Sequence, residues 1–195
     1  SYLMNHQIIF IFGFFSSILF AFTLVGVHVL LPSYVDKFLK MDGNIYASAE
    51  IYYSFGAIMA GLLILRIFKK FNTVFGIIVL MIAVSLAFYA MAIYNILWVF
   101  FLGNFILGIT NAGVRILKTT YLFNHVPNNL IGRTNSVFGF LNTIVRMLLI
   151  GLFTLPFYQI SDNIRYGYFA GVIMMILTVI MLIIWYKRIV SVERN

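Results

Sequence analysis

Long apolar stretches separated by short polar links make up almost the whole chain. A helix that crosses the hydrocarbon core of a bilayer needs roughly 20 consecutive apolar residues. Stretches of this kind cover residues 7–31, 45–65, 73–93, 96–117, 136–160 and 167–186, in approximate bounds. The links contain residues that favour turns, among them Pro32, Pro127 and Asp162. We therefore predict an all-α integral membrane protein in which residues 1–195 form a single six-transmembrane-helix bundle.

The composition points to the same class of protein. Hydrophobic residues make up 63% of the chain and charged residues 9%, whereas an ordinary soluble domain has about 25% charged residues. A soluble chain of 195 residues could not bury that much apolar surface. We expect the lipid bilayer to cover it. The chain has no cysteine, so disulfides and thiolate metal sites are excluded. No metal-site or cofactor motif is present either, and we expect neither group.

The distribution of basic residues predicts the orientation. The formal net charge of +8 could indicate nucleic-acid binding in a soluble protein, but here the positive-inside rule is the simpler cause and no nucleic-acid partner is expected. A cytoplasmic N-terminus leaves only Lys37, Lys40 and Arg165 outside, and Arg146 within a span. We therefore predict a multi-pass protein of the cell membrane with both termini in the cytoplasm. The other nine basic residues then lie inside: Arg66, Lys69, Lys70, Arg115, Lys118, Arg133, Lys187, Arg188 and Arg194.

Polar residues within the stretches are spaced so that they share single helical faces. They are concentrated in the first, second, fourth and fifth stretches, so we predict four helices around an interior and two, residues 73–93 and 167–186, facing lipid. This distribution repeats after three helices, which predicts a three-plus-three repeat. The faces are Gly13, Ser17, Phe20, Leu24 and His28; Glu50, Tyr53, Ser54, Ala57 and Gly61; Asn104, Gly108, Asn111, Arg115 and Lys118; and Asn135, Gly139, Asn142 and Arg146.

Two interpretations of these faces remain open. Small and polar residues often only hold membrane helices together, which would explain the glycines, Ser17 and Ala57. The other interpretation is a substrate cavity lined by Arg146, Asn142, Asn104, Asn111 and Tyr53.

Glu50 and Arg146 are the strongest candidates for a functional role. An arginine in the middle of a span costs at least ~2.5 kcal/mol, so it is seldom there without a partner or a function. Glu50 and His28 lie at similar depths on neighbouring antiparallel stretches and could meet. A carboxyl group beside a histidine can take up and release a proton, so this pair is a candidate for proton coupling. The alternative is a static ion pair of Glu50 with Arg146 or His28.

Three stretches resemble the C-terminal half of a major facilitator superfamily transporter. Residues 61–70, GLLILRIFKK, resemble the family's cytoplasmic loop motif G-x-L-x-D-R-x-G-R-K, with Gly61, Arg66, Lys69 and Lys70 matching. Leu65 replaces the acidic position and Phe68 the second glycine. Residues 103–111 faintly resemble the family's R-x-x-x-G-x-G helix, with Asn104 in place of the arginine. Residues 127–133, PNNLIGR, resemble the linker P-x-x-x-x-G-R, including Gly132 and Arg133.

The resemblance implies helices seven to twelve of a twelve-helix fold, similar to the macrolide and siderophore exporter branch. It implies a secondary active transporter that exports a hydrophobic or amphipathic small molecule by alternating access, with proton coupling. The resemblance also implies that Gly61 permits close contact between helices. The chain begins with Ser1, so we expect a fragment or a processed product. Its partner would be a missing N-terminal six-helix half or a second copy of the chain.

Two other classes of function are considered. The first is a six-helix substrate-binding (S) subunit of an energy-coupling-factor vitamin importer. Such a subunit is complete at this length, is basic, and binds its ligand without coupling to protons. An intramembrane enzyme is not expected, because no catalytic serine or HExxH motif is present and the three histidines lie in separate stretches.

Overall fold

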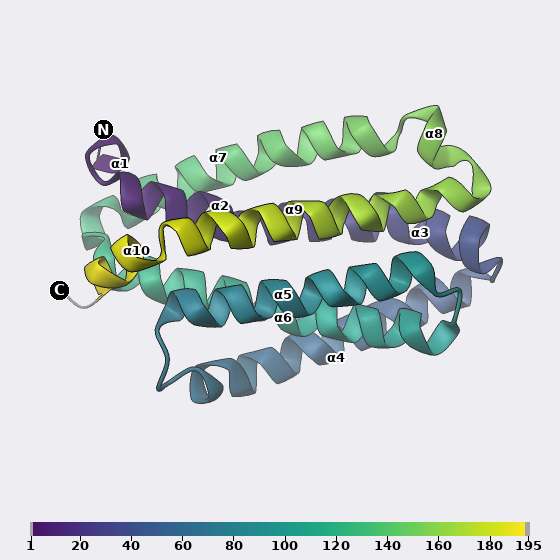
Figure 1. Cartoon of the computed structure of the whole chain (residues 1–195), viewed down its shortest axis with the longest axis horizontal. Coiled ribbons are helices and arrows are strands. Elements are labelled where there is room, and N and C mark those ends of the chain that lie inside the picture. The colour runs from purple at the N-terminus through teal and green to yellow at the C-terminus, as the bar shows by residue number, and fades with distance from the viewer. Residues whose placement is uncertain (1, 194–195) are drawn as a thin grey trace.

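The computed structural model describes residues 2–193, which form helices and no strand (Figure 1). Six helical runs are long and apolar enough to cross a membrane, which makes the chain a multi-pass membrane protein. Four of the long helices are α4 (Gly43–Ile67), α5 (Thr73–Ile93), α6 (Leu97–His125) and α7 (Asn128–Phe153), and the last is α9 (Arg165–Ile184). The first run joins α2 (Gln7–Val25), η1 (Gly26–Leu30), α3 (Leu31–Ser33) and η2 (Tyr34–Leu39). The short helices are α1 (Tyr2–Asn5), α8 (Pro156–Gln159), η3 (Ser161–Ile164) and α10 (Tyr186–Glu193).

The first helical run is longer than the predicted 7–31, because Pro32 does not end it. Pro32 lies in the first turn of α3, where a missing backbone N–H costs least. The π-helical turns η1 and η2 flank it and widen the helix on each side. The run ends at Leu39, and the next residue, Lys40, has a φ of 56° in the left-handed region.

The bounds of α6 and α7 also differ from the predicted 96–117 and 136–160. Helix α6 continues to His125, so Arg115 and Lys118 lie within it and not in a link. Helix α7 begins directly after Pro127 and ends at Phe153, so Gly132 and Arg133 belong to its first turns. Apolarity marks only the part of a helix inside the hydrocarbon core, and the polar ends of these helices extend past it.

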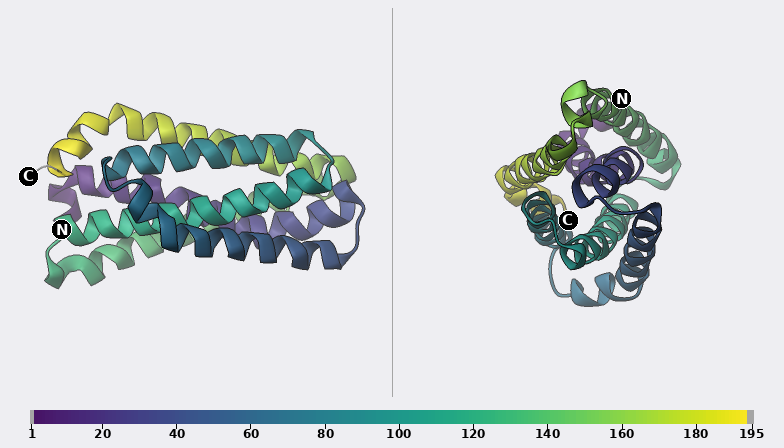
Figure 2. Two further views of the ribbon diagram at one scale, coloured as in Figure 1. Left: turned by 90° about the horizontal axis from the view of Figure 1, so that it is seen from below. Right: turned by 90° about the vertical axis from the view of Figure 1, so that its right-hand side faces the viewer.

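Each helix packs on a limited set of neighbours. The main pairs are α2 with α6, α7 and α9; α6 with α4 and α5; and α5 with α9. These contacting pairs show a twofold pattern. If α2 is exchanged with α6, α4 with α7 and α5 with α9, the same list of pairs results. Viewed along the bundle, α4 and α7 lie on one side and α5 and α9 on the other, with α2 and α6 between them (Figure 2).

Burial within the protein differs between the helices, and α5 keeps one exposed apolar face, so the prediction that 73–93 faces lipid stays a prediction. In the most apolar 18-residue window of α5, 61% of the residues are buried within the protein, against 22% in α4 and in α7. Helix α5 is more buried because it packs on both α6 and α9, whereas α4 packs mainly on α6 and α7 mainly on α2. The least covered helices are therefore two of the four that carry polar faces.

Close contact between α4 and α6 depends on two glycines. A Cβ atom on Gly56 would lie 2.2 Å from the carbonyl oxygen of Phe105, and one on Gly108 would lie 2.0 Å from that of Tyr53. Gly61, expected to permit such a contact, has nothing within 4 Å of a Cβ position among the described residues, so close contact there stays a prediction. The two backbones can approach only where no side chain separates them.

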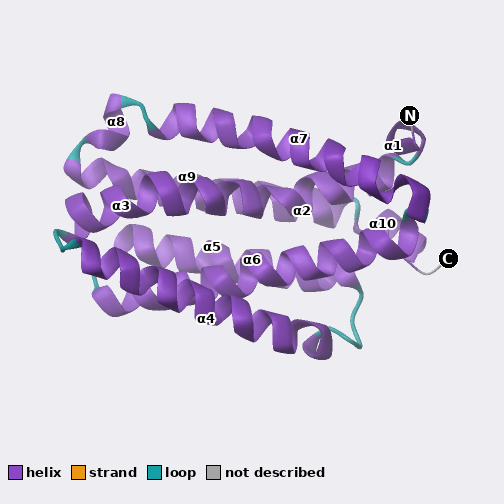
Figure 3. Ribbon diagram, turned by 180° about the vertical axis from the view of Figure 1, so that it is seen from behind, coloured by secondary structure: helices purple, strands orange, loops and turns teal. Residues whose placement is uncertain are grey.

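Both termini lie at the same end of the bundle (Figures 1 and 3). At this end α10 is attached to the start of α5. Glu193 Oε1 accepts hydrogen bonds from the Thr73 backbone nitrogen at 2.9 Å and from its hydroxyl at 2.5 Å. Tyr186 is hydrogen-bonded to Asn72 in the preceding link.

Candidate functional site: two polar cavities

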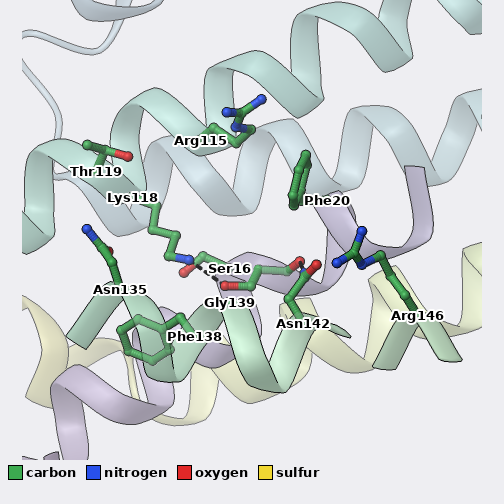
Figure 4. A pocket seen from close by; sticks show the side chains of 11 residues that line it. Ser16, Phe20, Arg115, Lys118, Thr119, Asn135, Phe138, Gly139, Asn142 and Arg146 are labelled. Atoms are coloured by element: carbon green, nitrogen blue, oxygen red, sulfur yellow. Dashed lines mark hydrogen bonds between the residues drawn. The ribbon is translucent and has the colours of Figure 1, made fainter. Parts of the chain in front are cut away.

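A cavity of about 350 Å³ lies between α2, α6 and α7 (Figure 4). Several of its lining residues are exposed, so it opens at the surface of the bundle. The cavity lies in the half of the bundle that holds both termini. Its lining residues are Ser16, Ser17 and Phe20 from α2; Arg115, Lys118 and Thr119 from α6; and Asn135, Phe138, Gly139, Asn142 and Arg146 from α7.

Lys118 and Asn142 both bind Ser17 in this cavity. Lys118 Nζ donates to Ser17 Oγ at 2.5 Å and lies 4.9 Å from the centre of the Phe138 ring. Asn142 Nδ2 donates to the Ser17 backbone oxygen at 2.9 Å. Ser17 and Asn142 are buried and Lys118 is half-buried, so these contacts join α2 to α6 and α7 in the interior.

The two arginines contribute further positive charge. Arg115 Cζ lies 4.8 Å from the centre of the Phe20 ring. Arg146 Nη2 donates to Thr143 Oγ1 at 2.9 Å, while its Nε is buried without a hydrogen-bond partner. In Figure 4 the Lys118 ammonium and the Arg146 guanidinium lie on opposite sides of Asn142. No acidic residue lines the cavity.

A second cavity, of about 310 Å³, lies between the first helical run, α4 and α6 in the other half of the bundle. His28 and Glu50 both line it, so the structure brings this predicted pair to one cavity. Tyr46 donates its hydroxyl hydrogen to Glu50 Oε1 at 2.7 Å. Within residues 2–193, no ion pair joins Glu50 to His28 or to Arg146. The other lining residues are Thr23, Leu24, Val27, Leu31, Tyr53, Ser54 and Asn104.

The residues predicted to line one substrate cavity are divided between these two. Asn142 and Arg146 line the first cavity, and Asn104 and Tyr53 line the second. Asn111 lies between α4 and α6, where its Nδ2 donates to the Tyr53 hydroxyl at 2.6 Å and its Oδ1 is buried without a partner.

The residues of the loop motif lie away from both cavities. Gly61 and Arg66 are on the exposed face of α4, and Lys69 and Lys70 are exposed in the link to α5. Lys70 lines a hollow formed with Tyr186 and Glu193 of α10. Gly132 and Arg133 are exposed at the start of α7, where Arg133 lines a hollow with Tyr2 and Leu3 of α1.

Arg115 and Lys118 are charged residues of this cavity that the sequence did not identify as site residues. They were counted as cytoplasmic link residues, although they continue the polar face that begins at Asn104. That face was the available signal, because a helix that keeps its polar spacing beyond the apolar stretch has not ended. Phe138 gave no signal of its own, since one phenylalanine among 21 is not distinctive.

Comparison with family models, with curated protein sequences and with solved structures gave no match. Residues 2–193 contain no group of three or more His, Asp or Glu side chains that could hold a metal ion. The fold and site therefore define a class: a multi-pass α-helical membrane protein with two polar cavities beside its central helices.

Proposed function

We propose that this chain is one half of a secondary active transporter, related to the C-terminal half of a major facilitator superfamily protein. The carrying observation is that ionisable side chains of the candidate membrane-spanning helices line two cavities on the same pair of central helices, α2 and α6. Ionisable residues inside a membrane are costly, and they mark substrate and ion pathways more often than structural contacts.

The arrangement of the helices supports a three-plus-three repeat. Exchanging the first three spans with the last three leaves the pairing of the helices unchanged and carries one cavity onto the position of the other. Transporters built from such repeats place their sites at the repeat interface and move by rocking of rigid units.

A second six-helix unit would cover the side formed by α4 and α7, where both cavities are found and burial is lowest. This unit is an N-terminal half of the same protein or a second copy of the chain. The two units would then enclose the cavities and open them alternately to each side of the cell membrane.

Glu50 and His28 are the proposed proton-coupling groups. Glu50 is exposed to its cavity and held by one hydrogen bond from Tyr46, so its carboxyl group can exchange a proton without breaking an ion pair. Proton entry would drive export of a hydrophobic or amphipathic small molecule that contacts Arg146, Asn142, Asn104 and Tyr53.

The test is transport by the full-length protein in vesicles with an imposed pH gradient. The probes are ethidium, dansylundecanoate and the methyl ester of dansylundecanoate, which differ in charge. We expect Glu50→Gln to abolish gradient-driven movement of the transported probe. The matched control is Asp42→Asn, which removes an exposed carboxylate before α4 that lies outside both cavities and should leave transport unchanged. Movement at the normal rate with Glu50→Gln would contradict proton coupling by Glu50.

The vitamin-importer subunit gives a different result in the same assay. The open surface at Gly61 would suit close contact with an energising partner helix, which is the observation in its favour. Such a subunit would bind its ligand but show no movement under a pH gradient, with or without Glu50. That outcome would replace the transporter proposal.

A further inference from the structure

The cavity between α2, α6 and α7 holds positive charge that its own residues do not balance. Arg115, Lys118 and Arg146 line it without an acidic neighbour. Positive charges gathered in one cavity without a counter-charge repel one another, so binding of a negative charge from another molecule is favoured there. The acidic residues of the chain all lie elsewhere: Asp36, Asp42, Glu50, Asp162 and Glu193.

Lys118 shows that this charge is directed into the cavity. A lysine near a helix end normally extends its ammonium toward the aqueous surface. Lys118, seven residues before the end of α6, instead donates to the buried hydroxyl of Ser17. Ser17 Oγ in turn donates to the Gly13 backbone oxygen at 2.6 Å, which fixes its position. The ammonium is thus held at the wall of the cavity.

Arg146 approaches from the opposite side with unused donors. Of the five N–H donors of a guanidinium, the structure assigns a partner to Nη2 only, and Nε is buried without one. A guanidinium forms paired hydrogen bonds with the planar oxygens of a carboxylate or with phosphate oxygens. Asn142 between the two cations contributes polarity, while Phe20 and Phe138 provide apolar surface in the same cavity.

We propose that this cavity binds the carboxylate or phosphate group of an amphipathic anion. Lys118 and Arg146 hold the anionic group, Arg115 at the exposed edge attracts it, and Phe20 and Phe138 contact the apolar part. The claim that this anion is the transported substrate rests on the proposed transporter function. The claim that the cavity binds an anion does not depend on that function. It narrows the substrate from amphipathic molecules in general to those with an anionic head.

The experiment measures binding of two matched probes to the full-length protein in nanodiscs of phosphatidylcholine. Dansylundecanoate carries a carboxylate, and its methyl ester has the same apolar part without the charge. We expect the carboxylate to bind about tenfold or more tightly than the ester, since hydrogen bonds to charged groups contribute that much. Equal affinity of the two probes would overturn the proposal.

Variants of the lining residues test whether this cavity causes the preference for the carboxylate over its ester. Lys118→Met and Arg146→Gln should each remove most of the preference for the carboxylate, whereas Lys118→Arg should retain it. Lys69→Gln is the matched control, because it removes a positive charge in an exposed link outside both cavities. Thermal unfolding shows which variants fold. If Lys118→Met does not fold, the result for Arg146→Gln tests the proposal. A full preference in folded Arg146→Gln or Lys118→Met would overturn the proposal.

The same assay separates a solute from a bilayer lipid as the source of the anion. If phosphatidylglycerol in the nanodiscs weakens binding to the normal protein but not to Lys118→Met, a lipid phosphate occupies the site. Unchanged binding assigns the site to a solute. Carboxylate binding without gradient-driven movement would leave this inference standing and overturn the transporter proposal. Gradient-driven movement of the probes without a preference for the carboxylate would overturn this inference and leave the transporter proposal standing.

Discussion

At the scale of single residues, tertiary contacts decide what a polar or small side chain does in this protein. Asn104, Asn111 and Asn142 look alike in the sequence, each on a polar helical face. Asn104 donates to its own helix at the Phe100 backbone oxygen, Asn111 to Tyr53 of α4, and Asn142 to Ser17 of α2. The last two therefore join helices, and only the tertiary contacts distinguish them from the first.

The glycines of α4 allow a prediction at this scale. Gly56→Ala should destabilise the protein by about 2 kcal/mol, because its Cβ would collide with the Phe105 backbone oxygen and α4 would have to move away from α6. Gly61→Ala in the same helix is the matched control, with open space at its Cβ position, and should leave stability unchanged or slightly higher. Thermal unfolding in detergent measures both. Equal unfolding temperatures would show that the close approach at Gly56 is not needed.

At the scale of elements, side-chain hydrogen bonds at the helix termini fix where α5 begins and how α10 is attached to it. Helix α5 begins after Asn72, whose Oδ1 accepts a hydrogen bond from the Phe75 backbone nitrogen. The Glu193 carboxylate from α10 accepts from Thr73 at the same terminus, where the helix dipole favours negative charge. The C-terminal helix is thereby fixed to an element more than a hundred residues earlier.

Removal of this attachment is the second prediction. Glu193→Ala should lower stability by about 1 kcal/mol, the usual cost of losing a helix cap, and release α10 from α5. Amide hydrogen exchange in residues 186–193 should rise accordingly. Ser191→Ala is the control, since Ser191 Oγ bonds only within α10, to the Arg188 backbone oxygen. If exchange in α10 does not change, the contact at Thr73 does not hold the helix in place.

At the scale of the whole molecule, the bundle places both termini at one end, as an even number of crossings requires. Arg115 and Lys118 contribute to a cavity, so the predicted orientation now rests on the other seven basic residues assigned to the cytoplasm. They still outnumber the three assigned to the outside, Lys37, Lys40 and Arg165.

The orientation is the third prediction, and the absence of cysteine makes it simple to test. A single cysteine at Lys70, in the link after α4, should react with a membrane-impermeant maleimide only in permeabilised cells. A cysteine at Asp42, in the link before α4, should react in intact cells, because it lies on the opposite side. Both positions are exposed, so access to the reagent depends on the side of the membrane. The reverse labelling pattern would invert the proposed topology.

The sequence by itself determined the class of protein and the six spans, because length and apolarity are local properties that a bilayer selects directly. It also identified the polar faces, since helical periodicity relates residues three and four positions apart. It placed the ends of the first, fourth and fifth spans less well. Pro32 does not end the first helical run, and the polar ends of α6 and α7 carry no apolar signal.

Only the tertiary structure decided how those faces combine. It divided the predicted substrate residues between two cavities, brought Arg115 and Lys118 beside Arg146, and left Glu50 with Tyr46 as its partner. It also buried more of α5 than of α4 and α7, which lie at the open side. These outcomes depend on which helices become neighbours and how each is rotated, and contacts between residues far apart in the chain set both.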